Sequence, residues 1–152
     1  MNISWKIKTF QELTNLELYY ILQLRAEVFI IEQNCPYQDA DGKDLKSLHL
    51  MGCNENEKLI AYSRIVPAGI SFKEISIGRV VSSPAYRGKG VGKLLMQEAI
   101  ATILKLNGNI PIRIGAQLYL KNFYEGFGFI QCSDEYLEDN IPHIEMLLEK
   151  RL

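Results

Sequence analysis

A glycine-rich segment with basic side chains is the part of the sequence best suited to bind a ligand. It runs from Arg87 to Lys93, reads Arg-Gly-Lys-Gly-Val-Gly-Lys, and stands between a strand-like run and a helix-like run. Glycine lets the backbone close on a ligand, and the amides and dipole at a helix N-terminus attract an anion. The span from Arg79 to Lys93 contains four basic residues and no acidic one. These features predict a site for a phosphate-bearing ligand; a glycine-rich turn with solvated basic residues is the structural alternative.

Two common nucleotide-binding motifs do not fit this segment. A Walker A loop has four residues between its glycines and then Lys-Ser/Thr, whereas Gly88 and Gly92 enclose three residues and Lys93 precedes Leu94. A dinucleotide-binding loop reads Gly-x-Gly-x-x-Gly, but the glycines here alternate at 88, 90 and 92. Both motifs are therefore excluded.

The elements that must position this segment follow from the spacing of the apolar residues. Alternation predicts strands over residues 3–10, 47–53, 58–66, 74–82, 110–115, 129–132 and 143–149. Helical spacing predicts a helix that starts at a Thr14 to Glu17 capping box and ends near Glu32, and further helices over 91–107 and 118–124. The loop from Asn34 to Lys46 carries three Asp and is long enough to suggest a function. This order predicts one α/β domain over residues 1–152.

Composition excludes several classes of protein. The chain has 152 residues, 47% hydrophobic and 23% charged, with a formal charge of −1, so no global field would attract nucleic acid. No apolar run reaches the ~20 residues of a membrane span, and the N-terminus lacks the apolar region of a signal peptide. Three widely spaced cysteines, an odd count without a CxxC pair, favour reduced thiols and a cytoplasmic location. The sequence does not decide the oligomeric state, and a homodimer is one of the states that it allows.

Two motifs resemble the GNAT superfamily of N-acetyltransferases. Arg87, Gly90 and Gly92 fit the Arg-x-x-Gly-x-Gly signature of that family's loop for the acyl-CoA pyrophosphate. Tyr124, followed by Gly128 and Phe129, fits the family's Tyr-x-x-x-Gly-Phe motif. The resemblance implies a mixed central sheet, splayed at its middle and flanked by helices, with acetyl-CoA in the opening. It also implies that Tyr124 is the general acid toward the departing thiolate, with a core aromatic as the structural alternative.

The resemblance implies cofactor contacts from three places. Val80, Val81 and Ser82 would pair with pantetheine like an added strand, and a backbone N–H at Val81 or nearby would polarise the thioester carbonyl. The pyrophosphate contacts would come from Arg87, Gly88, Lys89, Gly90, Val91, Gly92 and Lys93. Gln117 would contact the cofactor where the family commonly has Asn, and Leu120 replaces a common Ala.

Nearly the whole chain is similar to one branch of the superfamily, the ElaA-type proteins. The segments that carry this similarity are Arg25-x-x-Val28-Phe29-x-x-Glu32-Gln33, Cys35-Pro36-Tyr37, Ile77 to Val81, Gly115 to Gln117 and Tyr136 to His143. This similarity implies the fold more firmly than the substrate, because the acceptor of the branch is undefined.

An acidic segment is the predicted acceptor site. Asp134 to Glu145 contains five carboxylates, His143 and no Lys or Arg. A protonated amine must be attracted and then lose a proton before it attacks, so Glu32, Glu138 or His143 is expected to act as the base. Asp39, Asp41 and Asp44 are expected to help attract this cationic amine. A solvated acidic loop is the structural alternative.

No metal site is expected. The loop at Asp39 has its Gly fourth and Leu50 twelfth, where a calcium loop needs Gly sixth and Glu twelfth. His49 lies among apolar residues and is expected to be a core or edge residue. The resemblance to the GNAT superfamily implies acetyl transfer from acetyl-CoA to an amine in a ternary complex. The alternatives are a non-catalytic acyl-CoA-binding regulatory module and a phosphate-binding structural subunit.

Overall fold

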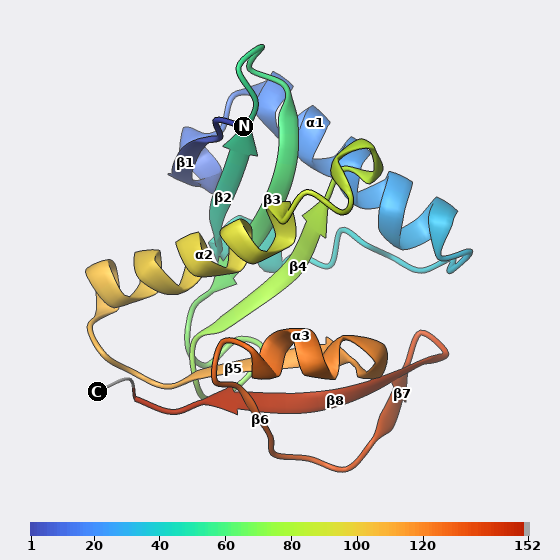
Figure 1. The fold of residues 1–152 in the computed structure, drawn as a ribbon, viewed down its shortest axis with the longest axis vertical. Coiled ribbons are helices and arrows are strands. Elements are labelled where there is room, and N and C mark those ends of the chain that lie inside the picture. Colours follow the sequence, from blue (N-terminus) through green and yellow to red (C-terminus); the bar gives the residue numbers. More distant parts are fainter. Residues whose placement is uncertain (151–152) are drawn as a thin grey trace.

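The structure is a computed structural model that describes residues 1–150, and it contains two antiparallel sheets (Figure 1). The first sheet has the order β1-β2-β3-β4, with bounds Ser4–Thr9, Leu48–Cys53, Leu59–Val66 and Ser76–Ser82. In the second sheet β8 (Ile141–Leu148) pairs with β5, β6 and β7, which span Ile112–Gln117, Ile130–Gln131 and Tyr136–Glu138.

The two sheets meet at one point, between the start of β4 and the start of β5. Ile75 and Ile112 form a parallel bridge, and the Arg113 N–H donates to the Ile75 carbonyl at 3.0 Å. Beyond this bridge β4 and β5 diverge, as Figure 1 shows. The expected mixed sheet, splayed at its middle and flanked by helices, is therefore confirmed.

Two long helices cover opposite faces of the first sheet. α1 (Asn15–Arg25) begins at the predicted capping box, in which Thr14 and Glu17 satisfy each other's backbone N–H. It continues as a π-helical turn over Ala26–Glu32, so the expected helix ends where predicted but changes its hydrogen bonding on the way. α1 packs on Met51, Tyr62 and Val81. No helix within residues 1–150 combines the length and the hydrophobicity needed to cross a bilayer.

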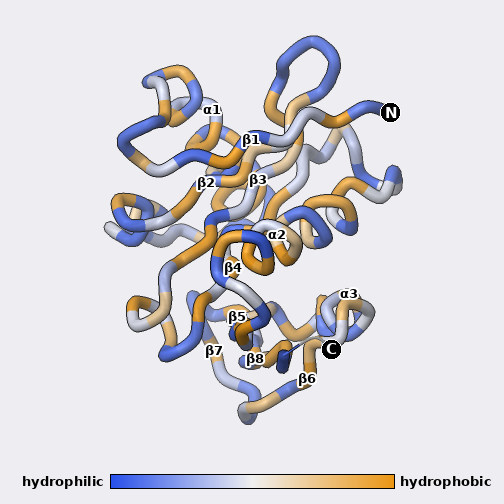
Figure 2. Tube along the Cα trace, turned by 90° about the vertical axis from the view of Figure 1, so that its left-hand side faces the viewer, coloured by the Kyte–Doolittle hydropathy of each residue, from blue (hydrophilic) through white to orange (hydrophobic). Residues whose placement is uncertain are grey.

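α2 (Val91–Asn107) forms the main core with both sheets. Its fully buried side chains Leu95, Met96, Ala99 and Ile103 belong to one apolar cluster with residues of β3, β5 and β8. Figure 2 shows that hydrophobic residues run along the strands, whereas many connecting loops are hydrophilic. α3 (Lys121–Glu125) is short, and 3₁₀ turns lie at Phe10–Glu12, Lys43–Lys46, Pro84–Tyr86 and Leu118–Leu120.

A hairpin near the C-terminus was not predicted. β7 joins β8 through Asp139 and Asn140, whose φ values are 50° and 65°. Two consecutive positive φ values are typical of a type I′ hairpin turn, which Asp and Asn tolerate better than other side chains. β8 therefore starts two residues earlier than predicted, at Ile141.

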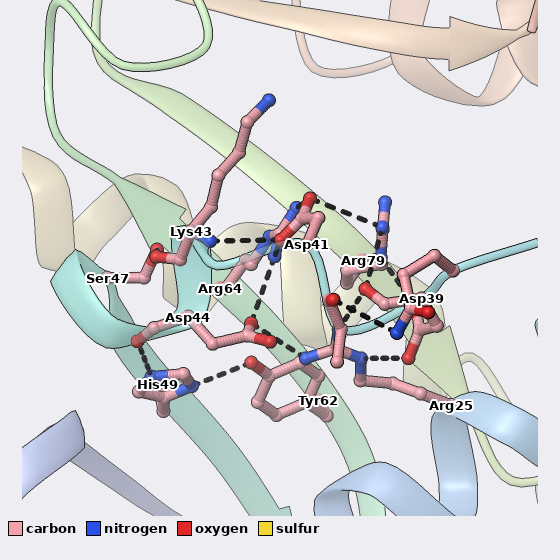
Figure 3. A network of polar contacts seen from close by, with 12 residues as sticks. Arg25, Asp39, Asp41, Lys43, Asp44, Ser47, His49, Tyr62, Arg64 and Arg79 are labelled. Carbon is pink, nitrogen blue, oxygen red and sulfur yellow. Dashed lines mark hydrogen bonds and ion pairs between the residues drawn. The ribbon is translucent and has the colours of Figure 1, made fainter.

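A closed ring of six alternating charges holds the loop of residues 34–46 against α1, β3 and β4 (Figure 3). Each guanidinium in the ring contacts two Asp carboxylates, and each carboxylate contacts two guanidinium groups. The six contacts are Arg25–Asp39 at 2.9 Å, Asp39–Arg79 at 2.8 Å, Arg79–Asp41 at 3.5 Å, Asp41–Arg64 at 2.7 Å, Arg64–Asp44 at 2.9 Å and Asp44–Arg25 at 2.8 Å.

Four members of the ring, Arg25, Asp39, Asp44 and Arg64, are buried, whereas Arg79 and Asp41 reach the surface, so the buried charges depend on one another for compensation. Arg25 is 0% and Arg64 3% exposed. Burial alone would raise the pKa of Asp44, but hydrogen bonds and charge from Arg25 and Arg64 outweigh it and hold that pKa below its ordinary value. Removing one member leaves its partners buried without full compensation, which is far costlier than losing an exposed pair.

We expect Arg25→Met to lower the free energy of unfolding by about 3–5 kcal/mol, because Asp39 and Asp44 would each lose a buried cationic partner. Lys8→Met is the control, since Lys8 pairs with Glu17 near the surface and should cost less than ~1 kcal/mol. Urea denaturation monitored by circular dichroism measures both. Equal losses in the two variants would show that the ring does not hold the fold.

Candidate active site

A cavity of about 500 Å³ opens where β4 and β5 diverge. β4 forms one wall, β5, α3 and the β7–β8 hairpin form the other, and the π-helical turn closes one side. Many of the residues singled out in the sequence line this cavity, namely Glu32, Val80, Val81, Ser82, Arg87, Gln117, Tyr124, Glu138 and His143. The fold thus brings together predicted residues from six separate parts of the chain.

The remaining predicted residues, Gly88 to Lys93, form the loop and first turn of α2 directly after Arg87. Gly88 and Gly90 both have φ of 76°, a left-handed conformation that glycine adopts freely. Gly90 is the N-cap of α2, and no side chain there accepts a hydrogen bond from the first amides of the helix. The first turn also holds no acidic residue. These amides are therefore available to an anion.

Two side-chain pairs connect the π-helical turn to the opposite side of the cavity. The Arg87 guanidinium contacts the Glu32 carboxylate at 2.5 Å, and this bond raises the pKa of Arg87. Gln33 and Gln117 exchange two amide hydrogen bonds, at 3.4 and 3.3 Å. The Glu32 carboxylate is therefore paired with the Arg87 guanidinium in this structure.

Tyr124 presents a buried phenol to the cavity. It is 7% exposed and packs edge-on against Phe123 and Phe129, with ring centroids 5.1 and 6.1 Å away. Its hydroxyl has no hydrogen-bond partner within residues 1–150. Burial raises the pKa of Tyr124 far above its ordinary value. The phenol therefore stays protonated at neutral pH and can donate to a bound ligand.

His143 lies on β8 with one ring nitrogen fixed by the backbone. Its Nδ1 is 2.7 Å from the Ile141 carbonyl, and because a carbonyl only accepts, Nδ1 must carry a proton. The other nitrogen, Nε2, is 3.5 Å from the Glu138 carboxylate. The ring stacks on Tyr136 from β7, with centroids 5.9 Å apart. In neutral His143, Nε2 is thus the nitrogen that can take up a proton.

Sequence reasoning assigned no role to two residues of the Asn34 to Lys46 loop that line the cavity. The Cys35 thiol donates to the Asp139 carbonyl at 3.2 Å and ties this loop to the hairpin. Tyr37 donates to Asp39 at 3.2 Å, and burial raises its pKa to about 12. The length and composition of this loop were the only signals in the sequence. The Cys35 contact joins residues 104 positions apart, and sequence alone does not show that Tyr37 is buried.

The structure corrects two expectations about charge. Asp39, Asp41 and Asp44 were expected to attract a cationic ligand, but three arginines already neutralise them in the ring. Arg79 was expected to add positive charge for an anion, but its guanidinium faces Asp39 and Asp41. Within residues 1–150 no His, Cys, Asp and Glu side chains form a group that could hold a metal ion. His49 is a buried core residue, as expected.

Comparisons with known proteins agree with this geometry. A family model described as an acetyltransferase (GNAT) domain matches residues 22–150. Protein ElaA of Escherichia coli K12 is 44% identical over 149 residues, covering 97% of each chain. The crystal structure of Escherichia coli ElaA superposes with a TM-score of 0.90 at 43% identity, covering 97% of this chain and 100% of that one. An acyl-CoA N-acyltransferase from Pseudomonas aeruginosa also gives 0.90, at 42% identity and 96% and 99% coverage.

The chain therefore belongs to the GNAT acetyltransferase family. Within this family it is similar to ElaA over nearly its full length, which confirms the resemblance to the ElaA-type branch.

We expect the two histidines of the chain to be opposite tautomers when neutral. His143 must carry its proton on Nδ1, whereas His49 places Nε2 at 2.9 Å from the Asp44 carbonyl and Nδ1 at 2.7 Å from the Tyr62 hydroxyl. His49 is thus an internal control with its proton on Nε2. Nitrogen NMR of the imidazole rings distinguishes the two forms, and finding the Nε2–H tautomer at both histidines would remove the basis for a role of His143 as a base.

Proposed function

We propose that this protein transfers an acetyl group from acetyl-CoA to a primary amine of a small molecule or peptide, by direct attack in a ternary complex. The observation that carries the proposal is that one cavity contains an unpaired strand edge, a protonated buried phenol and a histidine whose Nδ1 is fixed by the backbone, which leaves Nε2 as its proton acceptor. Membership of the GNAT family supports it, as does the likeness to an acyl-CoA N-acyltransferase. An aminoglycoside 6′-N-acetyltransferase complexed with coenzyme A shares the fold, with a TM-score of 0.68 at 16% identity.

The cofactor pyrophosphate would bind at the start of α2. Backbone amides from Gly88 to Lys93 have no side-chain acceptor at the helix start, and Lys89 and Lys93 add positive charge. Arg87 is paired with Glu32 in the structure, so an anion at Arg87 would compete with that carboxylate.

The thioester carbonyl would bind to the edge of β4 that faces the cavity. The Ser83 N–H donates to the Ile60 carbonyl at 2.8 Å, and Tyr62 pairs with Val81. Because hydrogen bonding alternates along an antiparallel strand, the Val81 N–H faces β3 and the Ser82 N–H faces the gap. We therefore place the donor at Ser82 or at Val80, just before Val81, instead of at Val81 itself. One such donor typically contributes roughly 10²–10³ in rate by stabilising the oxyanion.

Proton transfer would use His143 and Tyr124. The cationic amine gives one proton to His143 Nε2, its nitrogen attacks the carbonyl carbon, and the carbon–sulfur bond breaks, while the second proton of the new amide nitrogen passes to Tyr124 to replace the one that the phenol donates. Tyr124 then gives its phenolic proton to the departing thiolate. Among the three predicted bases, Glu32 is paired with Arg87, and Glu138 has a side chain that is 59% exposed. We therefore assign the base to His143, with Glu138 stabilising the protonated imidazole.

Free cysteines support a reducing compartment such as the cytoplasm. Cys35, Cys53 and Cys132 form no disulfide, and the first two are buried. Persistent free thiols are typical of reducing environments.

The central test is thiol release from acetyl-CoA across small amines, polyamines, amino acids and peptides. We expect release that depends on the amine, with a matching acetylated product in mass spectra. Binding of acetyl-CoA without amine-dependent release would instead support a non-catalytic acyl-CoA-binding module.

Gly90→Asp should abolish acetyl-CoA binding, because it places a negative charge and a strained left-handed side chain at the helix start. Gly69→Asp is the matched control: Gly69 is also left-handed and open to solvent, but it lies between β3 and β4 and not at the start of α2. Isothermal calorimetry measures both. Unchanged affinity in a folded Gly90→Asp variant would contradict this binding site.

Tyr124→Phe should lower kcat by about 10²–10⁴-fold, the usual contribution of a general acid, while the acetyl-CoA affinity stays close to that of the wild type. Tyr20→Phe, at an exposed residue of α1, is the control. Steady-state kinetics and calorimetry separate the two effects. A wild-type kcat in Tyr124→Phe, with the chemical step limiting, would rule out the proposed acid.

Glu138→Gln with Asp139→Asn should raise the KM of the amine more than that of acetyl-CoA. Both carboxylates line the cavity, and unlike the ring aspartates they have no arginine partner within residues 1–150. The rate should rise with pH through the neutral range, because an alkyl amine arrives protonated and must lose a proton before it attacks. Asp134→Asn with Glu135→Gln, in the same segment but outside the cavity, is the control. Equal effects of both double variants, or a preference for anionic acceptors, would contradict a cationic acceptor.

A further inference from the structure

Arg79 has an unusual backbone conformation for a residue inside a strand. Its φ is 49°, in the left-handed region that side chains other than glycine rarely adopt. The other non-glycine residues of the described chain with positive φ lie in turns or loops between elements, namely Asn34, Glu57, Asp139 and Asn140. Such a conformation persists only where the surrounding structure holds it.

This conformation forms a β-bulge in β4. Arg64 pairs with Gly78 and Tyr62 pairs with Val81, so Ser63 alone stands opposite two residues, Arg79 and Val80. A bulge bends a strand and redirects the groups that follow it. Here those groups are Val80 to Ser82, which line the cavity.

The Arg79 side chain is tied to the charge ring. Nε donates to Asp39 Oδ1 at 2.8 Å, and Nη2 donates to the Asp39 carbonyl at 3.2 Å. The guanidinium also lies over the Tyr37 ring, 5.5 Å from its centroid. Asp39 is held in turn by Arg25 of α1, and Asp41 by Arg64 of β3 (Figure 3). The bulge is therefore tethered through the ring to α1 and β3, while Arg79 itself also lines the cavity.

We propose that Arg79 is a positioning residue for acyl transfer, and that its place in the charge ring holds the bulge so that the edge from Val80 to Ser82 faces the thioester. This rests on the proposed function, in which that edge polarises the carbonyl. Arg79 lines the cavity, but its guanidinium N–H groups are directed at Asp39 and Asp41, so we assign it a positioning role and no direct contact with the substrate. Small displacements of an oriented catalytic group are known to cost large factors in rate.

The test compares two arginines of equal exposure. Arg79→Ala should lower kcat by about 10- to 100-fold and change the acetyl-CoA Kd much less, since the loop at the start of α2 is intact. Arg113→Ala is the matched control: its side chain is 22% exposed against 21% for Arg79, and it pairs with Glu74 and Glu145 outside the cavity. Arg113→Ala should keep the wild-type kcat even if its melting temperature falls.

A third variant separates the effect of the backbone conformation on kcat from the effect of the Arg79 side chain. Arg79→Gly should recover part of the kcat lost in Arg79→Ala, because glycine adopts the left-handed conformation without being held. Equal kcat values for Arg79→Ala and Arg113→Ala would overturn the proposal, as would an Arg79→Gly variant no better than Arg79→Ala.

Amide NMR of the free protein tests the proposal independently of turnover. In Arg79→Ala, the amides of Val80, Val81 and Ser82 should shift and exchange with solvent faster than in Arg113→Ala. Unchanged amides in Arg79→Ala would overturn the positioning role even if the wild type acetylates amines. A wild type without any amine-dependent thiol release would overturn the proposed function, while selective changes in these amides would still show that Arg79 holds the bulge.

Discussion

Within residues 1–150 the two sheets are joined by one bridge, between Ile75 just before β4 and Ile112 of β5, and most of the site depends on the divergence of β4 and β5 beyond it. Backbone groups on a strand edge inside a protein require hydrogen-bond partners. The divergence leaves the edge of β4 beside a cavity of about 500 Å³, where an extended ligand with amide groups can pair with it. It also brings Tyr124 from α3 and His143 from β8 to the same space.

The charges of this nearly neutral chain are arranged in three groups. In the ring, three arginines and three aspartates neutralise one another's charges, and their ion pairs hold the loop of residues 34–46 against α1, β3 and β4. Basic residues without a ring partner remain at the start of α2, including Lys89 and Lys93, and acidic residues remain at the hairpin, including Glu138. This arrangement supports our proposal of an anionic cofactor at the start of α2 and a cationic acceptor at the hairpin.

Local patterns were sufficient to predict the parts of the fold that depend on neighbours in sequence. The capping box at Thr14, the glycine-rich start of α2 and the alternating strands are of this kind. The ring was not predictable, because Arg25, Arg64 and Arg79 reach the same loop from distances of 14 to 40 residues along the chain. The same holds for the bulge, because its left-handed residue is Arg79 and not the neighbouring glycine, Gly78. The choice among the three candidate bases could be made only when the contacts of Glu32 and His143 were known.

We propose that the amine and the acyl donor occupy this one cavity together and react directly. Initial-velocity kinetics with both substrates varied distinguishes this direct transfer from a two-step transfer through the protein. Double-reciprocal plots should give intersecting lines, as a ternary complex requires, and no acetylated protein should appear when acetyl-CoA is supplied without amine. Parallel lines together with an acetylated enzyme would contradict the account, because the acetyl group would then pass through a residue of the protein before it reaches the amine.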